Sequence, residues 1–171
     1  MSNSASSPAV TELATQCKKI LQADSGPEGR AKVASLLSTT LANPANIDAL
    51  IPTDTGERDL LYQDPESGFC IFAHQYKAPK ESLPHDHGPS WAIYAQARGE
   101  TEMTDYEHVA SDNDRETGQV RATRTYRLLP GDVHVYNEGD LHAPVRSGPT
   151  CLLRIEGMDM SKITRRRYEA V

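Results

Sequence analysis

The amino-acid sequence predicts an all-β core, a barrel or a sandwich, preceded by N-terminal α-helices. Two observations carry this prediction. Apolar residues recur every three or four positions in the first third of the chain, and short β-type runs separated by turn residues follow from about residue 60. The 171 residues, 37% of them hydrophobic, suffice for one core and an extension. We expect a helical extension over residues 1–55, a β-barrel over 56–160 and a basic C-terminal tail over 161–171.

Two amphipathic helices are expected in the extension. Residues 9–23 and 28–42 each place apolar side chains three and four positions apart, which puts them on one helix face. Asn43-Pro44 stops the second helix, and a third, short helix is expected near residues 44–51.

Four β-type runs follow the helices. They cover residues 68–78, 90–109, 121–140 and 148–157, with Gly, Pro, Asn and Asp between them. These intervals are typical of an all-β sandwich or barrel. The polar residues 110–120 are expected to form the tip of a hairpin.

The composition argues against several partners. The formal net charge of −6 is unfavourable for nucleic-acid binding, which needs a basic face. The one basic cluster, Lys162 with Arg165–Arg167, is expected to be a solvated tail. No apolar run approaches the ~20 residues of a membrane span, and no signal peptide is visible. The odd and widely spaced Cys17, Cys70 and Cys151 favour free thiols in a reducing, cytoplasmic compartment.

The stretch LPHDHGPSWAIYAQARGE carries two histidines one residue apart, His85 and His87. Residues i and i+2 of a strand point to the same face, so a strand here would aim both imidazoles at one point. Neutral imidazole is a common ligand of first-row metals. The pair alone is weak evidence, because two histidines near a turn on the surface would read the same way.

The segment LLPGDVHVYNEGDLHAP offers a third candidate ligand. Pro130-Gly131-Asp132 predicts a tight turn that starts a strand, and a second turn over residues 137–140 precedes His142. An antiparallel barrel can bring His142 beside His85 and His87. The remaining histidines are interpreted as an ordinary strand residue and two partly exposed polar residues: His134, His74 and His108.

These two segments resemble the two motifs of the cupin superfamily. The first motif has HxH, then a glutamate, then a glycine, and His85, His87 and Gly99 fit it. The second has PGD, a strand, a short turn and a histidine, which Pro130–Asp132 and His142 fit. The resemblance implies a double-stranded β-helix, or jelly roll, in which the three histidines hold one metal ion.

The glutamate of the first motif is absent between His87 and Gly99. A ligand set of three neutral histidines leaves a divalent ion its full charge, which favours an anionic substrate such as a thiolate or an enolate. Three-histidine cupin sites resemble those of the cysteine dioxygenase family of thiol dioxygenases, and those of diketone-cleaving and some aromatic-ring dioxygenases.

The resemblance is closest to the thiol dioxygenases, which share the N-terminal helices and the sequence His85-Asp86-His87, here called the HDH triplet. It implies a mononuclear non-heme iron(II) that uses O2 to oxidise a small thiol to a sulfinate. Three features depart from the family. Ala92 stands where the mammalian enzymes carry a crosslinking cysteine, TCLLRIEG lacks the Ser-His-Tyr pattern, and Arg58 matches the carboxylate-binding arginine only with an insertion.

A second arginine competes for that role. Alternation along TCLLRIEG puts Leu152, Arg154 and Glu156 on one face. Arg154 would point toward the metal if this face lines the cavity, with Glu156 as an orienting partner. The alternative is an exposed pair that contributes little to stability.

The apolar residues that follow the HDH triplet could line the pocket or belong to the core. Trp91 and Ile93 share the parity of His85 and His87, so they would wall the pocket if one strand spans all four. Ordinary barrel core is the alternative for Trp91, and core is favoured for Tyr94.

The resemblance therefore implies a small cytoplasmic thiol dioxygenase, and we expect a monomer or a homodimer whose partners are a small thiol and O2. Dioxygenolytic C–C cleavage of a diketone or enolate stays open, as does a non-redox cupin that binds a metal or a sugar. Nickel, zinc, copper or manganese would also suit three histidines in place of iron(II).

Overall fold

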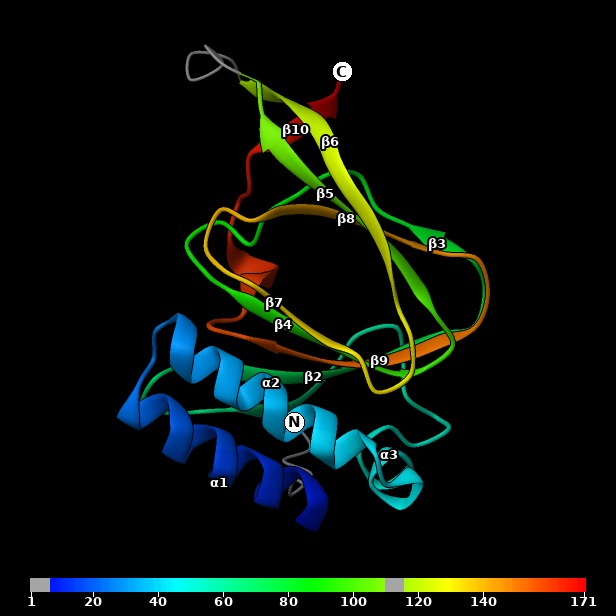
Figure 1. Ribbon diagram of the computed structural model, residues 1–171. Coiled ribbons are helices and arrows are strands. Elements are labelled where there is room, and N and C mark those ends of the chain that lie inside the picture. Colours follow the sequence, from blue (N-terminus) through cyan, green and yellow to red (C-terminus); the bar gives the residue numbers. More distant parts are fainter. Residues whose placement is uncertain (1–6, 110–115) are drawn as a thin grey trace.

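The structure, a computed structural model, describes residues 7–109 and 116–171. Two five-stranded sheets, with orders β1-β2-β9-β4-β7 and β10-β6-β5-β8-β3, curl toward each other, and three helices lie under the first (Figure 1). The elements are α1 (Pro8–Ala23), α2 (Pro27–Leu41), α3 (Pro44–Leu50), β1 (Asp59–Gln63), β2 (Cys70–Tyr76), β3 (Lys80–Glu81), β4 (Ala92–Arg98), β5 (Thr101–His108), β6 (Thr117–Leu128), β7 (Val133–Tyr136), β8 (Leu141–Arg146), β9 (Thr150–Glu156), the 3-10 turn η1 (Met160–Lys162) and β10 (Arg167–Ala170).

The three expected helices are confirmed, and each begins at a proline, Pro8, Pro27 or Pro44. Proline suits the first turn because its missing N–H would have no helical partner there. The side chains of Ser7 and Asn43 cap α1 and α3 by accepting a hydrogen bond from the backbone N–H of the first turn. Local chemistry thus fixes where the helices start.

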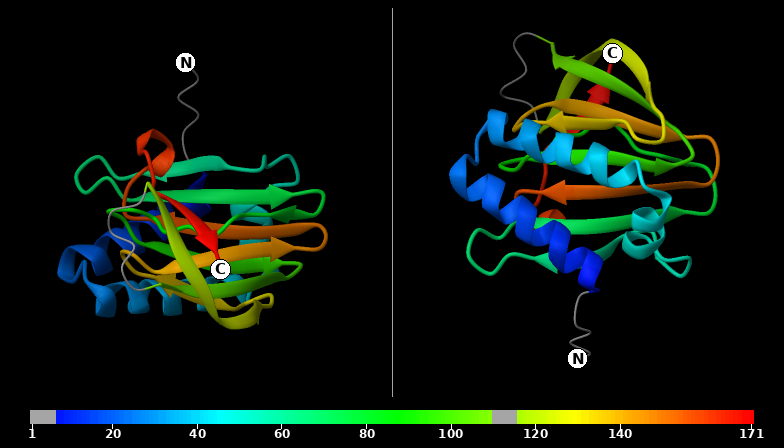
Figure 2. Two further views of the ribbon diagram at one scale, coloured as in Figure 1. Left: turned by 90° about the horizontal axis from the view of Figure 1, so that it is seen from above. Right: turned by 60° about the horizontal axis from the view of Figure 1, so that its bottom comes forward.

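The helical layer covers the outer face of the first sheet (Figure 2). Side chains that alternate along β4 and β9 supply the sheet side of this core, because successive residues of a strand face opposite ways. Ile93, Leu153 and Ile155, each fully buried, pack with the apolar faces of α1 and α2. The neighbouring positions on the same strands must then point into the space between the two sheets.

The pairing is antiparallel throughout both sheets, apart from β10. β4 and β9 form the centre of one sheet, β5 and β8 that of the other, and a bridge between His85 and His142 extends the second sheet. The predicted fold class is confirmed: the chain is a double-stranded β-helix preceded by N-terminal helices. None of the helices within the described residues has the length and apolar character that crossing a bilayer requires.

Two expectations about chain segments need comment. Residues 110–115 of the expected hairpin tip lie outside the described residues, and 117–120 already belong to β6. The expectation of a solvated basic tail holds only in part: Lys162, Arg165 and Arg167 are exposed, but the segment is attached to the barrel. Residues Arg167–Ala170 form β10, which pairs in parallel with β6, and Tyr168 is only 9% exposed. The three cysteines are free, as expected.

Candidate metal centre

The structure brings His85, His87 and His142 together inside the barrel. One ring nitrogen of each lies within 4.8 Å of those of the other two, the only such group found in the described part of the chain. Two backbone hydrogen bonds of 3.0 and 2.9 Å join His85 to His142, so the bridge between their strands fixes their spacing. Two nitrogens that bind one ion at about 2.0–2.1 Å lie at most about 4.2 Å apart, so the three rings are close to the spacing that one ion requires.

Hydrogen bonds to backbone carbonyls orient two of the rings. The Nδ1 of His85 lies 2.9 Å from the carbonyl oxygen of Leu83, and the Nδ1 of His142 lies 3.1 Å from that of Asp140. A carbonyl can only accept, so each Nδ1 carries the proton and each Nε2 keeps a free lone pair. This is the tautomer that a metal ligand needs, and such bonds hold ligating rings in place.

The third ring meets a carboxylate instead. The Nδ1 of His87 lies 3.9 Å from Oε1 of Glu156, and both side chains are almost fully buried. Glu156 therefore stands behind the imidazole of His87, as a carboxylate often does behind a ligating histidine.

All three imidazoles are held in the neutral form. Burial lowers the pKa of His85 to about 4, and the nearby positive charges of Arg165 and Arg154 act in the same direction. Burial also holds the pKa of His87 and of His142 well below the ordinary value. Three neutral imidazoles with free lone pairs fit a divalent transition-metal ion.

We expect the metal-free protein to lose stability as the pH falls from about 6.5 to about 4. The folded pKa of His85 is about 4 and its ordinary value is 6.5, so the unfolded chain binds more protons between these values. His87 and His142 shift the same way. Urea unfolding at several pH values measures the free energy of unfolding, and the slope should be shallower in His85→Ala. A free energy that rises on acidification would contradict the expectation.

The sequence did not indicate that Tyr94 contacts the histidine cluster. It is buried, as expected of core, but its hydroxyl lies 3.3 Å from Nε2 of His87 and 3.4 Å from Nε2 of His142. Nη1 of Arg154 donates to the same hydroxyl over 3.1 Å. Tyr94 thus places an O–H group beside the Nε2 atoms of two of the three histidines.

The prediction that Trp91 and Ile93 wall the pocket is wrong. A turn at Gly88, which has a φ of +55°, separates His87 from β4, so the parity of the histidines does not carry into the strand. Trp91 and Ile93 instead pack in the core under the helices, and the guanidinium of Arg30 lies 5.2 Å from the centre of the Trp91 ring.

Both arginines that the sequence singled out lie in the cavity, and both are paired. Nε of Arg154 lies 2.9 Å from Oε1 of Glu156, which is 1% exposed, so the alternative of an exposed pair is wrong. Nη2 of Arg58 lies 3.4 Å from Oε2 of Glu156 and 3.1 Å from Oδ1 of Asp159. The guanidinium of Arg58 also stacks 3.8 Å from the ring centre of Phe72.

The remaining histidines stay apart from this cluster. His134 lies in β7 between two tyrosine rings, as expected of a strand residue, and His108 is exposed. The expectation that His74 is partly exposed is wrong, because it is 1% exposed. Its Nδ1 lies 2.6 Å from the carbonyl oxygen of Glu57, which fixes the ring inside the barrel.

The helical layer also supports the third histidine. Both guanidinium Nη atoms of Arg30, on α2, bind the carboxylate of Glu138 at 2.6 and 2.7 Å, and Nη1 also donates to Asn137 over 2.9 Å. These residues form the turn that leads into His142. The sequence motif marks this turn, but only the fold reveals its attachment to α2.

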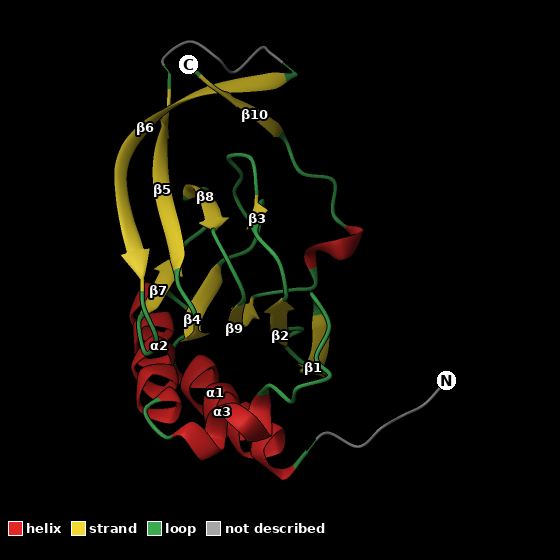
Figure 3. Ribbon diagram, turned by 90° about the vertical axis from the view of Figure 1, so that its right-hand side faces the viewer, coloured by secondary structure: helices red, strands yellow, loops and turns green. Residues whose placement is uncertain are grey.

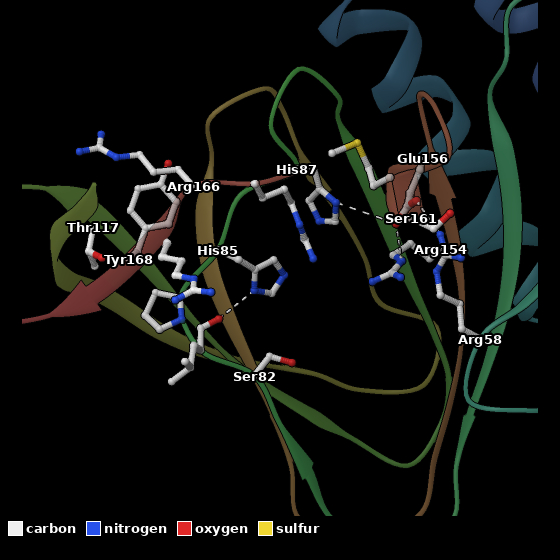
Figure 4. A pocket seen from close by; sticks show the side chains of 15 residues that line it. Arg58, Ser82, His85, His87, Thr117, Arg154, Glu156, Ser161, Arg166 and Tyr168 are labelled. Atoms are coloured by element: carbon white, nitrogen blue, oxygen red, sulfur yellow. Dashed lines mark hydrogen bonds and ion pairs between the residues drawn. The ribbon is translucent and has the colours of Figure 1, made fainter. Parts of the chain in front are cut away.

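A cavity of about 860 Å³ opens beside His85 and His87. Figure 4 shows Arg58, Arg154 and Glu156 on one side of these histidines, and Tyr168 and Arg166 from the C-terminal segment on the other. The volume of this cavity is that of a small-molecule site. Five arginines line it, namely Arg58, Arg154, Arg165, Arg166 and Arg167. Such a lining suits an anionic ligand.

Comparisons with known proteins bear on the fold. No protein-family model matches the sequence, and no curated protein matches it. Among solved structures, the Bacillus halodurans protein BH2720 is similar with a TM-score of 0.50 and 12% identity, over 68% of this chain and 81% of that one. A cupin superfamily protein of Desulfitobacterium hafniense gives a TM-score of 0.45 and 17% identity, over 60% and 76%. KdgF from Halomonas sp. gives 0.44 and 16%, over 64% and 77%.

Proposed function

We propose that the protein is a mononuclear non-heme iron dioxygenase that oxidises a small thiol to a sulfinate. His85, His87 and His142 would hold iron(II). The observation that carries the proposal is the set of three neutral imidazoles, of which His87 and His142 are buried and have the hydroxyl of Tyr94 beside them. In the reaction, both atoms of O2 are transferred to the sulfur of the thiolate, which loses four electrons to them.

The charge of the site favours a thiolate. The three imidazoles bring no negative charge, and the carboxylate of Glu156, which lies behind His87, is paired with Arg154. An anionic ligand would therefore offset the charge of a divalent ion directly. Bound iron(II) would supply the redox chemistry that lets O2 react with a thiolate.

The protein's own groups would position the substrate. Arg154 donates to the oxygen of Tyr94, so the hydroxyl hydrogen of Tyr94 is free to point toward the histidines. There it would donate a hydrogen bond to an anionic ligand in the cavity, which strengthens as negative charge develops on that ligand. Arg154 donates to Tyr94 and pairs with Glu156, which lies behind His87, so these two residues fix the positions of Tyr94 and His87 relative to each other.

An oxygen-electrode screen of the anaerobically iron-loaded protein tests the proposal. We expect one iron per chain and O2 uptake with cysteine, cysteamine or 3-mercaptopropionate, with a sulfinate as the product by mass spectrometry. O2 uptake with a β-diketone but with no thiol would assign the site to C–C cleavage. Iron binding without O2 uptake on either substrate class would indicate a non-redox protein.

A further inference from the structure

The last residues of the chain form one wall of the cavity. Residues 163–171, here called the strap, leave η1 and run to β6, where β10 pairs with Thr117–Val120 (Figure 3). A Cβ at Gly118 would lie 2.8 Å from the ring of Tyr168, so a glycine lets the strap approach β6 closely. The strap is therefore an ordered part of the barrel that packs against β6.

The strap is also bonded to the residue between the first two histidines. The hydroxyl of Tyr168 donates to Oδ2 of Asp86 over 2.8 Å in a buried hydrogen bond. Nη1 of Arg165 donates to the backbone carbonyl of Asp86 over 3.2 Å. These two contacts hold Arg165 beside the HDH triplet, at the edge of the cavity that it lines.

The two sides of the cavity differ in charge. On the side of β9, the charges of Arg58 and Arg154 are matched by those of Glu156 and Asp159. On the strap side, Arg165 has no carboxylate within ion-pair distance among the described residues, and its one hydrogen bond there is to a backbone carbonyl. Among the described residues, Arg165 therefore brings to this side of the cavity a positive charge that forms no ion pair.

We propose that Arg165, and neither Arg58 nor Arg154, receives the anionic group of the substrate, a small thiol that carries a carboxylate. This assignment rests on the proposed function. A guanidinium has five N–H donors in a planar fork and binds a carboxylate in a bidentate manner. Only one donor of Arg165 is engaged, whereas the guanidinium groups of Arg58 and Arg154 already meet carboxylates.

Calorimetric titration of the anaerobic, iron-loaded protein with two thiols tests the assignment. We expect Arg165→Gln to weaken binding of 3-mercaptopropionate roughly 10- to 100-fold, the effect of losing a charged hydrogen-bonding partner. Binding of 2-mercaptoethanol, which has no carboxylate, should change less than about threefold, and Arg165→Lys should keep part of the affinity for the acid. Arg127→Gln, at the other end of β6, is the matched control and should match wild type.

Each other outcome has a definite meaning. Equal loss for both thiols in Arg165→Gln would show that Arg165 acts through Asp86 on the triplet, and would overturn the assignment. An unchanged affinity in Arg165→Gln, with a selective loss for the acid in Arg58→Gln, would overturn it in favour of the β9 side. If the wild-type protein binds neither thiol, the proposed function fails as well; if it binds both and Arg165→Gln has no effect, only the assignment fails.

Discussion

The His142→Ala variant is expected to lose its metal. His142 is fully buried, its Nδ1 donates to the carbonyl of Asp140, and its Nε2 presents the lone pair that would bind a metal. Changing groups that merely orient metal ligands costs about 10- to 100-fold in affinity, so removing a ligand should cost more than about 100-fold. Anaerobic titration of the protein with iron(II) against a chromogenic chelator measures this, and elemental analysis gives the stoichiometry.

His134→Ala is the matched control, because His134 lies in β7 and belongs to the same motif segment but not to the cluster. It should keep about one iron per chain. A thermal melt of both metal-free variants separates loss of the site from loss of the fold. The ligand assignment is wrong if His134→Ala empties the site while His142→Ala still binds iron.

Much of the fold was predictable because its determinants are local. Gly131 has a φ of +94° in the PGD turn, and Oδ2 of Asp132 accepts a hydrogen bond from the N–H of Leu129 over 2.8 Å. Gly99 has a φ of +68°, and a Cβ there would lie 2.3 Å from the carbonyl oxygen of Pro149. Glycine is the residue that suits such positions, so the glycines in the sequence indicate where these turns lie.

The inner wall of the site was less predictable because it depends on strand register. A shift of one residue exchanges the two faces of a strand. The turn after His87 makes that shift, and it sends Trp91 to the helices and Tyr94 to the histidines. Two histidines separated by one residue do not reveal where the following strand begins.

The strap shows the same limit over a longer range. A run of arginines at the end of a chain has the composition of a solvated tail. The partners of this run are distant in sequence: Tyr168 bonds to Asp86, and β10 pairs with Thr117–Val120. Nothing near the arginines signals those contacts, so only the fold reveals that they line the cavity.

Tyr94→Phe should leave the metal in place and remove most of the activity. The change deletes one hydroxyl, which lies 3.3 and 3.4 Å from the Nε2 atoms of His87 and His142, and keeps the ring that fills the core. Removing a positioned proton or hydrogen-bond donor at a reacting group costs about 10²- to 10⁴-fold in rate. We therefore expect kcat for thiol oxidation to fall in this range, with iron content near one per chain.

Tyr136→Phe is the matched control for that result. Tyr136 is also a buried tyrosine, and its ring stacks on His142 with centroids 3.9 Å apart, but its hydroxyl bonds to that of Tyr126 at 2.6 Å. Losing this hydroxyl should lower stability by about 1 kcal/mol and leave kcat within a few-fold of wild type. Equal losses of kcat in the two variants would mean that Tyr94 acts through packing. A loss confined to Tyr94→Phe, with iron retained, would show that its hydroxyl acts on the bound substrate.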